Sequence, residues 1–288
     1  MVIPTYRREE TLVACLRCAL DQSYRPLEII VVDQTESHKT STIEFLDSVR
    51  DRIRLIHIAT PGAVEARNCG LREAGGEIII FIDDDTTFGP DFVSAHVAAH
   101  RRGADVVQGR VMEPGRGVSH RAQWVLPWLR VVGSNTHDQT SPTNTLTGCN
   151  FSISRNAARQ VGEFDAGFSG VLIHEDADYG VRCYKIGLKM IFDADAFLMH
   201  HRDAVGGVDA TMKAAMRIFE PSVLRNELYF ARKHFNVLVV WQYKWRLARR
   251  LRRARAKAGL LESVSPRQLL RQADREARAL LKVRNQSD

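Results

Sequence analysis

Three consecutive aspartates, Asp83, Asp84 and Asp85, directly follow an apolar run at residues 78–82. Adjacent carboxylates repel one another, so a folded chain retains them most easily beside a cation or in full contact with water. Carboxylate oxygens at this density are typical of Mg²⁺ or Mn²⁺ sites, in which the metal is usually shared with substrate phosphates. The alternative is a solvated acidic turn, in which an aspartate caps the next helix.

A second acidic group, Glu175, Asp176 and Asp178, follows His174 and a glycine-rich stretch. A carboxylate in the first turn of a helix can serve as a general base. Acidic residues in a first turn also complement the helix dipole without any catalytic role. The residue types alone leave both interpretations open.

Two adjacent histidines, His200 and His201, end an apolar stretch at residues 196–199. Either imidazole could complete an aspartate-rich metal site, because imidazole nitrogen is a common ligand of transition metals. The alternative is a pair of hydrogen-bonded surface histidines at a strand end.

The cysteines carry no metal-binding pattern. Cys15 and Cys18 form a C-x-x-C, but no second Cys or Cys/His pair completes a zinc site, so we predict small apolar residues on a helix. The 5 cysteines of the chain are too scattered for a disulfide scaffold, which favours a reducing compartment.

The elements that must position these side chains are strands alternating with helices. We expect helices at residues 9–22 and 62–74, and strands at 2–3 (cut off by Pro4), 27–32, 54–58 and 77–82. Near-continuous apolar runs in this alternation indicate an α/β fold with a parallel sheet covered on both faces. Ligands bind such sheets at the carboxyl ends of the strands, which here carry Pro4-Thr5-Tyr6, Asp33 and the three aspartates.

The second half of the chain is less regular. We expect strands at residues 150–154 and 189–192 with a helix at 176–186 between them. The segment 110–147, with scattered Pro, Gly, Trp and Asn, is predicted to form loops and short strands that line a second substrate site.

The charge is unevenly distributed. Residues 225–288 contain 17 Lys and Arg against 5 Asp and Glu, a net charge of +12, whereas residues 1–224 contain 24 against 29, a net charge of −5. We therefore predict a catalytic domain at 1–224 and a basic helical C-terminal extension at 225–288.

No stretch reaches the roughly 20 apolar residues that a membrane span needs. The N-terminus lacks the basic-then-apolar order of a signal peptide. The expected location is the cytoplasm, with peripheral attachment to the inner face of the membrane as a possibility raised by the basic extension.

A series of motifs along residues 2–202 has a specific order: P-T-Y, V-V-D, G-A-V-E-A-R-N-C-G-L, F-I-D-D-D-T-T-F-G-P-D, G-C-N-F-S-I-S-R, G-E-F-D, H-E-D-A-D-Y-G and A-F-L-M-H. The series resembles the family-2 glycosyltransferases with the glycosyltransferase A fold, and weaker similarity continues through residues 225–229. The resemblance implies a Rossmann-like, mostly parallel sheet flanked by helices. It also implies an enzyme that uses a nucleotide-diphosphate sugar, with UDP favoured.

The resemblance assigns the donor site to strand ends. Pro4, Thr5 and Tyr6 match the segment that lies against the nucleotide, and Asp33 matches the aspartate that hydrogen-bonds the base. Arg67, in A-R-N, matches an arginine that reaches the nucleotide. Of the three consecutive aspartates, Asp83 and Asp84 match positions that approach the ribose.

The resemblance also assigns the metal and the base. Asp85 matches the ligand of Mn²⁺ or Mg²⁺ that bridges the diphosphate, and His200 fits the later histidine ligand better than His201. Asp176 matches the catalytic aspartate, with Glu175 beside it. Such an enzyme inverts the anomeric centre in one displacement, as Asp176 takes the proton of the acceptor hydroxyl.

The chain departs from the family pattern in three places. It begins almost on the first strand, Arg7 stands where many members have Asn, and V-V-D-Q-T-E-S replaces the commoner V-V-D-D-G-S. The Q-x-x-R-W motif of processive synthases is absent, since residues 242–246 read Q-Y-K-W-R, so we expect transfer of a single sugar to a saccharide or lipid-linked acceptor.

The basic extension contains a helix pattern of its own. Residues 244–257 hold 8 Lys and Arg and no acid, and Leu238, Trp241, Trp245 and Ala248 recur at the spacing of one helix face. A basic helix with tryptophans suits an anionic membrane surface, here through residues 238–257. The alternatives are packing or self-association, and, less in keeping with the sequence, nonspecific nucleic-acid binding. A further helix is expected at 266–283.

Two other functions remain open at this stage. A nucleotidyltransferase also combines a parallel sheet with metal-binding aspartates, but its usual glycine-rich loop after the first strand is absent from Pro4-Thr5-Tyr6-Arg7-Arg8. A non-catalytic protein that binds nucleotide sugars or tethers to a membrane would have no need of Asp85, Asp176 and His200.

Overall fold

The computed structural model describes residues 1–115, 117, 123–125, 130–132, 136–171, 173–202, 219–258 and 265–284. The chain divides into two compact units. The first comprises Met1–Trp124, Val131–Asp165 and Asp176–Ala210, and the second comprises Val125–Arg130, Ala166–Glu175 and Thr211–Asp288. The boundary expected after residue 224 stays a prediction.

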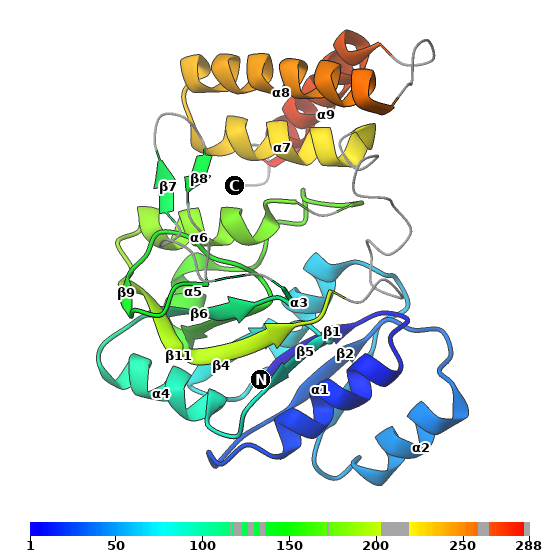
Figure 1. Cartoon of the computed structure of the whole chain (residues 1–288), viewed down its shortest axis with the longest axis vertical. Coiled ribbons are helices and arrows are strands. Elements are labelled where there is room, and N and C mark those ends of the chain that lie inside the picture. The colour runs from blue at the N-terminus through cyan, green and yellow to red at the C-terminus, as the bar shows by residue number, and fades with distance from the viewer. Residues whose placement is uncertain are drawn as a thin grey trace. The chain divides into compact units, whose positions relative to one another are not determined.

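The first unit is built on one large sheet (Figure 1). The strand order is β3-β2-β1-β4-β10-β6-β11-β5, and β9 pairs with β11. The strands are β1 (Val2–Thr5), β2 (Ile30–Asp33), β3 (Arg54–His57), β4 (Ile78–Ile82), β5 (Thr86–Phe88), β6 (Val106–Met112), β9 (Ser141–Pro142), β10 (Asn150–Ser154) and β11 (Met190–His200). Two further short strands, β7 (Gln123–Val125) and β8 (Arg130–Val132), pair with each other.

The half of the sheet formed by β3, β2, β1 and β4 is parallel, as the alternation of strands and helices predicts. Strand β1 extends further than expected. It continues through Pro4, which lies opposite Val32, and ends at Thr5. The ladder between β1 and β4 contains only the pair Val2 and Phe81. Pro4 lies beyond that ladder, so its missing N–H leaves no bond to β4 unmade.

The other half of the sheet is mixed. Strand β10 runs antiparallel to both β4 and β6, β11 is parallel to β6, and β5 is antiparallel to β11. Strand β11 reaches from Met190 to His200 and joins the two apolar stretches that looked separate in the sequence, with a register shift between Asp193 and Phe197. The α/β fold is thus confirmed, with a sheet that is parallel in only one of its halves.

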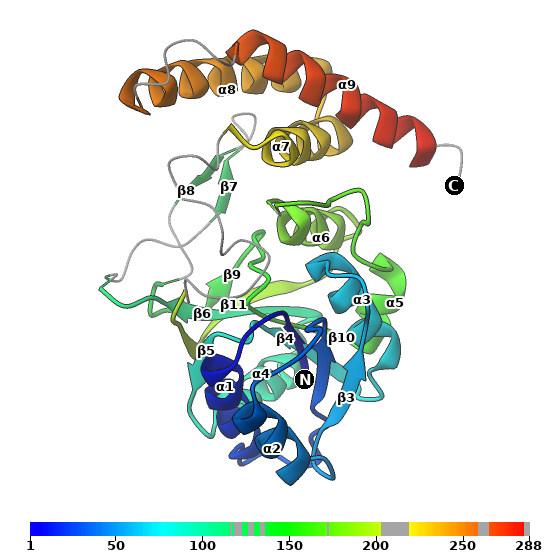
Figure 2. The ribbon, with the colours of Figure 1, turned by 90° about the vertical axis from the view of Figure 1, so that its right-hand side faces the viewer.

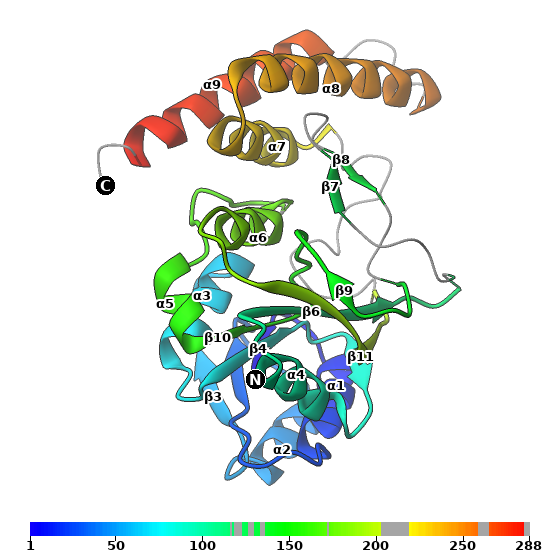
Figure 3. The ribbon, with the colours of Figure 1, turned by 90° about the vertical axis from the view of Figure 1, so that its left-hand side faces the viewer.

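Helices cover both faces of this sheet. They are α1 (Glu10–Leu20), α2 (Thr40–Ser48), α3 (Ala63–Glu73), α4 (Phe92–Arg101), α5 (Arg155–Val161) and α6 (Glu175–Lys185). Figures 2 and 3 show α1 and α4 on one face and α3 and α5 on the other. Cys15 lies on the buried side of α1 and Cys18 is half-buried on the same helix, as predicted.

The core lies on both sides of β4, because neighbouring residues of a strand point to opposite faces. Ile80 and Ile82 join the apolar cluster under α1 and α4. Phe81 faces the other way and stacks on Phe151, with 4.8 Å between ring centroids. This packing fixes the end of β4, from which the three aspartates follow.

The second unit contains the helices α7 (Pro221–His234), α8 (Val237–Ala258) and α9 (Pro266–Arg284), which lie against one another (Figure 2). Asp274 of α9 pairs with Arg232 of α7 and Lys244 of α8. Burial alone would raise the pKa of Asp274, but Lys244 and Arg232 hold it below its usual range. One acid thus joins the three basic helices.

Helix α8 exposes the apolar stripe expected from the sequence. Leu238, Trp241 and Trp245 are 73%, 68% and 53% exposed, whereas Leu247 and Leu251 are buried on the side facing its neighbours. Within the second unit, these three side chains are therefore left largely exposed, while Ala248, the last member of the expected stripe, is half-buried. Among the residues that the structure describes, no helix is long and apolar enough to cross a bilayer.

Candidate active site

The carboxyl ends of β1 and β4 meet at one edge of the sheet. The Thr5 hydroxyl, at the end of β1, donates a 2.6 Å hydrogen bond to Oδ2 of Asp84, just after β4. This pairing directs the Asp84 carboxylate toward the end of β1, whereas the carboxylates of Asp83 and Asp85 converge with His200. Burial raises the pKa of Asp84 to about 7, although the Thr5 hydroxyl and the Arg8 guanidinium both oppose the shift.

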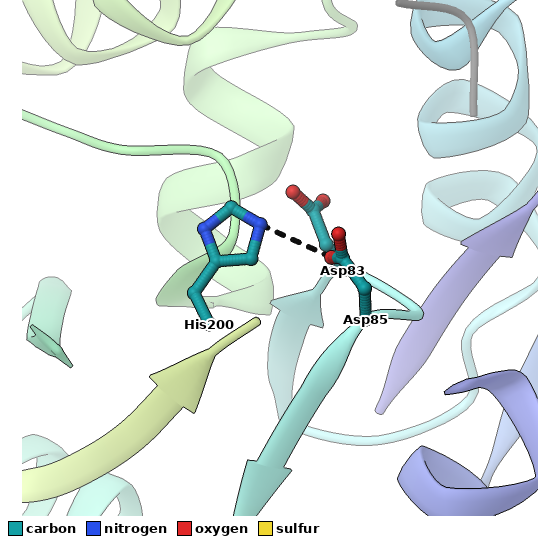
Figure 4. Close-up of side chains that lie close together, drawn as sticks. All are labelled: Asp83, Asp85 and His200. Carbon is teal, nitrogen blue, oxygen red and sulfur yellow. Dashed lines mark ion pairs between the residues drawn. The ribbon is translucent and has the colours of Figure 1, made fainter. Parts of the chain in front are cut away.

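Asp83, Asp85 and His200 form one cluster (Figure 4). Their nearest ligand atoms all lie within 4.8 Å of one another, and Nε2 of His200 is 3.1 Å from Oδ1 of Asp85. The antiparallel pairing of β11 with β5 creates this contact, since His200 lies opposite Thr86. The resemblance assigned Asp83 to the ribose, whereas here it lies among the possible metal ligands.

The neighbouring histidine points away from the cluster. The ring of His201 hydrogen-bonds the Thr87 hydroxyl at 2.8 Å near the surface, while its backbone N–H donates to the carbonyl of Asp85. Alternation along the strand sends the two imidazoles to opposite sides. The structure thus brings His200, and not His201, to the aspartates.

The donor set suits a hard or borderline divalent cation. Two carboxylates and one imidazole are compatible with Mn²⁺ or Mg²⁺, and three convergent side chains leave room for substrate oxygens. Burial tends to lower the pKa of His200, but its hydrogen bonds to Asp85 and Cys149 and the charge of Asp83 raise it to about 11. The neighbouring carboxylates thus favour the protonated form of His200.

Sequence reasoning missed Arg8. Its guanidinium is buried, with Nη2 3.3 Å from Oδ2 of Asp85 and Nε 3.9 Å from Oδ1 of Asp84. Arg7 takes a left-handed conformation, with φ of 53°, and pairs at the surface with Glu36. The sequence does not predict which of the two adjacent arginines is buried, because this depends on the backbone conformation of Arg7.

At the end of β2, Asp33 is held on both sides. Its Oδ1 accepts the backbone N–H of Thr35 at 2.9 Å, and its Oδ2 lies 3.0 Å from Nε2 of His38. The other ring nitrogen of His38 lies 3.2 Å from Glu9. The sequence singled out Asp33 but neither His38 nor Glu9, because the contact joins a loop to the start of α1. Tyr6 is half-buried, under the guanidinium of Arg7.

Asp176 joins the same region through the segment before β10. Its Oδ2 accepts the backbone N–H of Gly148 at 2.9 Å. A Cβ at Gly148 would lie 2.8 Å from Nη2 of Arg67, and that same nitrogen is 3.3 Å from Oδ1 of Asp83. The chain of contacts therefore connects Asp176 with the aspartate cluster through Gly148 and Arg67. Glu175 is buried and belongs to the second unit.

The sheet order and the strand-end carboxylates define an α/β fold with a candidate metal site at the carboxyl edge of its sheet. The family model for glycosyl transferase family 2 matches residues 1–162. The chain therefore belongs to glycosyl transferase family 2, as the motif series predicts, and the nucleotidyltransferase alternative has no support.

Curated relatives are glycosyltransferases of bacterial origin. The amylovoran biosynthesis glycosyltransferase AmsB of Erwinia amylovora is 25% identical over 70% of this chain and 68% of its own length. The UDP-Glc:alpha-D-GlcNAc-diphosphoundecaprenol beta-1,3-glucosyltransferase WfaP of Escherichia coli is 35% identical over 30% of this chain. That match spans 34% of WfaP, so much of each protein lies outside the similarity.

Solved structures share the fold. S. aureus TarS 1–349 in complex with UDP-GlcNAc has a TM-score of 0.63 at 17% identity, covering 94% of this chain and 78% of the TarS 1–349 chain. GalNAc-T7 with UDP, GalNAc and Mn²⁺ also has a TM-score of 0.63, at 14% identity, covering 80% of this chain and 47% of its own. These similarities confirm the predicted glycosyltransferase A fold.

Proposed function

We propose that this glycosyltransferase moves one sugar from a nucleotide-diphosphate sugar, with UDP favoured, to an acceptor hydroxyl in the assembly of a cell-surface polysaccharide or glycolipid. The observation that carries the proposal is the cluster of Asp83, Asp85 and His200, connected to Asp176 through Gly148 and Arg67. The printed functions of AmsB and WfaP and the UDP-GlcNAc complex of TarS support the choice of donor and acceptor classes.

In the proposed reaction, Asp176 accepts the proton of the acceptor hydroxyl as its oxygen attacks the anomeric carbon. The bond from that carbon to the diphosphate oxygen breaks at the opposite face, which inverts the anomeric centre. A divalent cation held by Asp85 and His200, with Asp83 beside them, would stabilise the charge on the leaving diphosphate.

The remaining residues bind the donor. Asp33, oriented by His38, accepts a hydrogen bond from the base, and Arg67 reaches the nucleotide. Pro4, Thr5 and Tyr6 lie along the nucleotide, and Asp84 contributes by fixing the Thr5 hydroxyl. The residues expected to line the acceptor site, 110–147, fall partly outside the described residues.

A thermal-shift panel tests the donor site. UDP, GDP, dTDP and CDP are added with and without Mn²⁺ to the wild type and to Asp85→Ala. We expect one nucleotide to stabilise the wild type only with metal, since a ligand at 100 times its Kd stabilises a protein by about 2.7 kcal/mol. Asp195→Ala, at an exposed position of β11, is the control and should respond like the wild type. A full response in Asp85→Ala would contradict the metal assignment.

We also propose that α8 docks on an anionic membrane surface and so brings the enzyme to a lipid-linked acceptor. Leu238, Trp241 and Trp245 are exposed apolar side chains, and the same helix exposes arginines such as Arg249, whose guanidinium lies over the Trp245 ring. Apolar and aromatic side chains enter the lipid interface while arginines attract anionic headgroups. The side chains of 255–258 lie outside the described residues.

Co-sedimentation with vesicles tests this docking. The wild type should bind vesicles containing phosphatidylglycerol, and bind less to pure phosphatidylcholine or at high salt. Trp241→Ala/Trp245→Ala should lose most of the binding, while Ile43→Ala, at an exposed apolar residue of α2, should not. Unchanged sedimentation of the double variant would overturn the proposal. A concentration-dependent dimer on gel filtration would favour self-association instead.

A further inference from the structure

Asn150, at the start of β10, is a buried residue of the first unit that the proposed reaction does not use. Its Nδ2 donates two hydrogen bonds, to the backbone carbonyl of Arg110 at 3.0 Å and to that of Ala196 at 2.9 Å. Its Oδ1 lies 3.1 Å from Nε2 of His96 in α4. Because an amide oxygen can only accept, His96 donates from Nε2. The Asn150 amide thus links α4, β6 and β11.

The Asn150 side chain reaches β11 across Gly109 of β6. A Cβ at Gly109 would lie 2.4 Å from Nδ2 of Asn150 and 2.4 Å from the carbonyl oxygen of Ala196. Real Cβ atoms do not approach other heavy atoms so closely, and a side chain at position 109 would occupy the space that the amide fills. The glycine therefore leaves room for an amide to join the two strands.

The amide meets β11 where the pairing of this strand is irregular. The ladder between β11 and β6 shifts register between Asp193 and Phe197, whose partners on β6 are consecutive residues. Residues 194–196 of β11 therefore form a bulge, a feature that often redirects a side chain next to an active site. Ala196 belongs to this bulge, so Asn150 joins β11 to β6 at the point where the ladder is interrupted.

The register after the bulge decides which histidine meets the aspartates. Residues 197–199 pair with β6 again, and His200 is the last residue of β11 that pairs with β5. Because side chains alternate along a strand, a slip by one residue would exchange the sides to which His200 and His201 point. Cys149, the residue before Asn150, also hydrogen-bonds His200. The start of β10 therefore acts on the end of β11 at two points.

We propose that Asn150 is a positioning residue for the metal site, which fixes the register of the last residues of β11 and thereby brings His200, rather than His201, to the aspartates. This inference rests on the proposed role of His200 as a metal ligand. Asn150 touches neither the metal nor the substrate in this proposal. Its contribution is to hold an imidazole where Asp83 and Asp85 can share a cation with it.

The test compares Asn150→Ala with Asn226→Ala in the full chain. Asn226 of α7 is equally buried, and its Nδ2 also donates to two backbone carbonyls, those of Ser169 and Val171. Each variant removes the donor from two carbonyls and should lower the temperature of unfolding. We expect only Asn150→Ala to weaken the binding of Mn²⁺ alone, by about tenfold, as for residues that support a metal ligand. The EPR signal of free Mn²⁺ measures this affinity.

Wild-type Mn²⁺ affinity in a folded Asn150→Ala would overturn the proposal, as would an equal loss of affinity in Asn226→Ala. If Asn150→Ala does not fold, His96→Leu takes its place, because this variant removes the donor to Oδ1 and leaves the Asn150 amide present. We expect His96→Leu to weaken Mn²⁺ binding by a smaller factor. Unchanged affinity in that variant would then count against the proposal.

A double-variant cycle separates positioning of the histidine from a general effect on the sheet. If Asn150 acts through His200, Asn150→Ala/His200→Ala should bind Mn²⁺ no more weakly than His200→Ala. A further loss in the double variant would mean that Asn150 acts by another route, and would overturn the proposal. A wrong assignment of the metal site is distinguishable, since His200→Ala itself would then bind Mn²⁺ like the wild type.

Discussion

Asp176→Asn is expected to reduce sugar transfer by about 10²–10⁴-fold, the usual contribution of a general base. Asparagine has the shape of aspartate and retains one oxygen, so the contact with the Gly148 N–H can survive. The amide cannot take the proton of the acceptor hydroxyl. The loss should therefore appear in kcat, and binding of the nucleotide with metal should persist.

The measurement combines the initial rate of nucleoside diphosphate release with nucleotide binding followed by thermal shift. Asp195→Asn removes one carboxylate from an exposed position of β11 and should transfer sugar at the wild-type rate. Loss of nucleotide binding in Asp176→Asn would mean that Asp176 belongs to the donor site. Full activity would remove it from the mechanism.

His200→Ala is expected to weaken Mn²⁺ binding by at least about 10–100-fold, the range reported for residues that only support a metal ligand. His200 supplies an imidazole to the cluster with Asp83 and Asp85, so its removal takes away a donor atom rather than a support. Calorimetric titration of the protein with Mn²⁺ in the presence of the nucleotide measures this effect directly.

His201→Ala is the matched control, since it deletes the adjacent imidazole on the opposite side of the strand. Its ring contacts Thr87 and not the aspartates, so Mn²⁺ affinity should stay within about twofold of the wild type. Equal losses in the two variants would indicate that the histidines act through the stability of the β11–β5 pairing. A loss confined to His201→Ala would mean that the sequence register was misassigned.

The parallel part of the fold and its strand-end side chains were predictable from sequence. Apolar runs of four to six residues separated by amphipathic helices have few arrangements, and a parallel sheet brings their carboxyl ends to one edge. Thr5, Asp33 and the three aspartates therefore meet where the rule places them. The choice of His200 over His201 also follows, once A-F-L-M-H is aligned with the motif series.

The contacts that complete the site come from segments whose position the rule for parallel sheets does not predict. Strand β10 inserts antiparallel between β4 and β6, and its apolar pattern fits either direction. Gly148 approaches Arg67 because of that insertion, so the route from Arg67 to Asp176 has no local signal in the sequence. Arg8 depends on a left-handed neighbour, Arg7, whose conformation no residue preference demands.

In the basic extension, the sequence predicts a helix with apolar residues but does not predict which apolar face of that helix is buried. Periodicity placed Leu238, Trp241 and Trp245 on one face of α8, and the structure has them there. The same periodicity could not tell which face packs, because Val240, Leu247 and Leu251 form a second apolar stripe. The burial of that second stripe against neighbouring helices decides which apolar face is left in contact with solvent.

The close approach of Gly148 to Arg67 has an evolutionary consequence. Any side chain at position 148 would meet the Arg67 guanidinium at 2.8 Å, well inside the contact distance of real Cβ atoms. Substitutions at the two positions should therefore be correlated among descendants of a common ancestor. A lineage that gains a side chain at 148 should carry either a shorter residue at 67 or an Arg67 guanidinium that has moved aside, and either change would alter how Asp83 is paired.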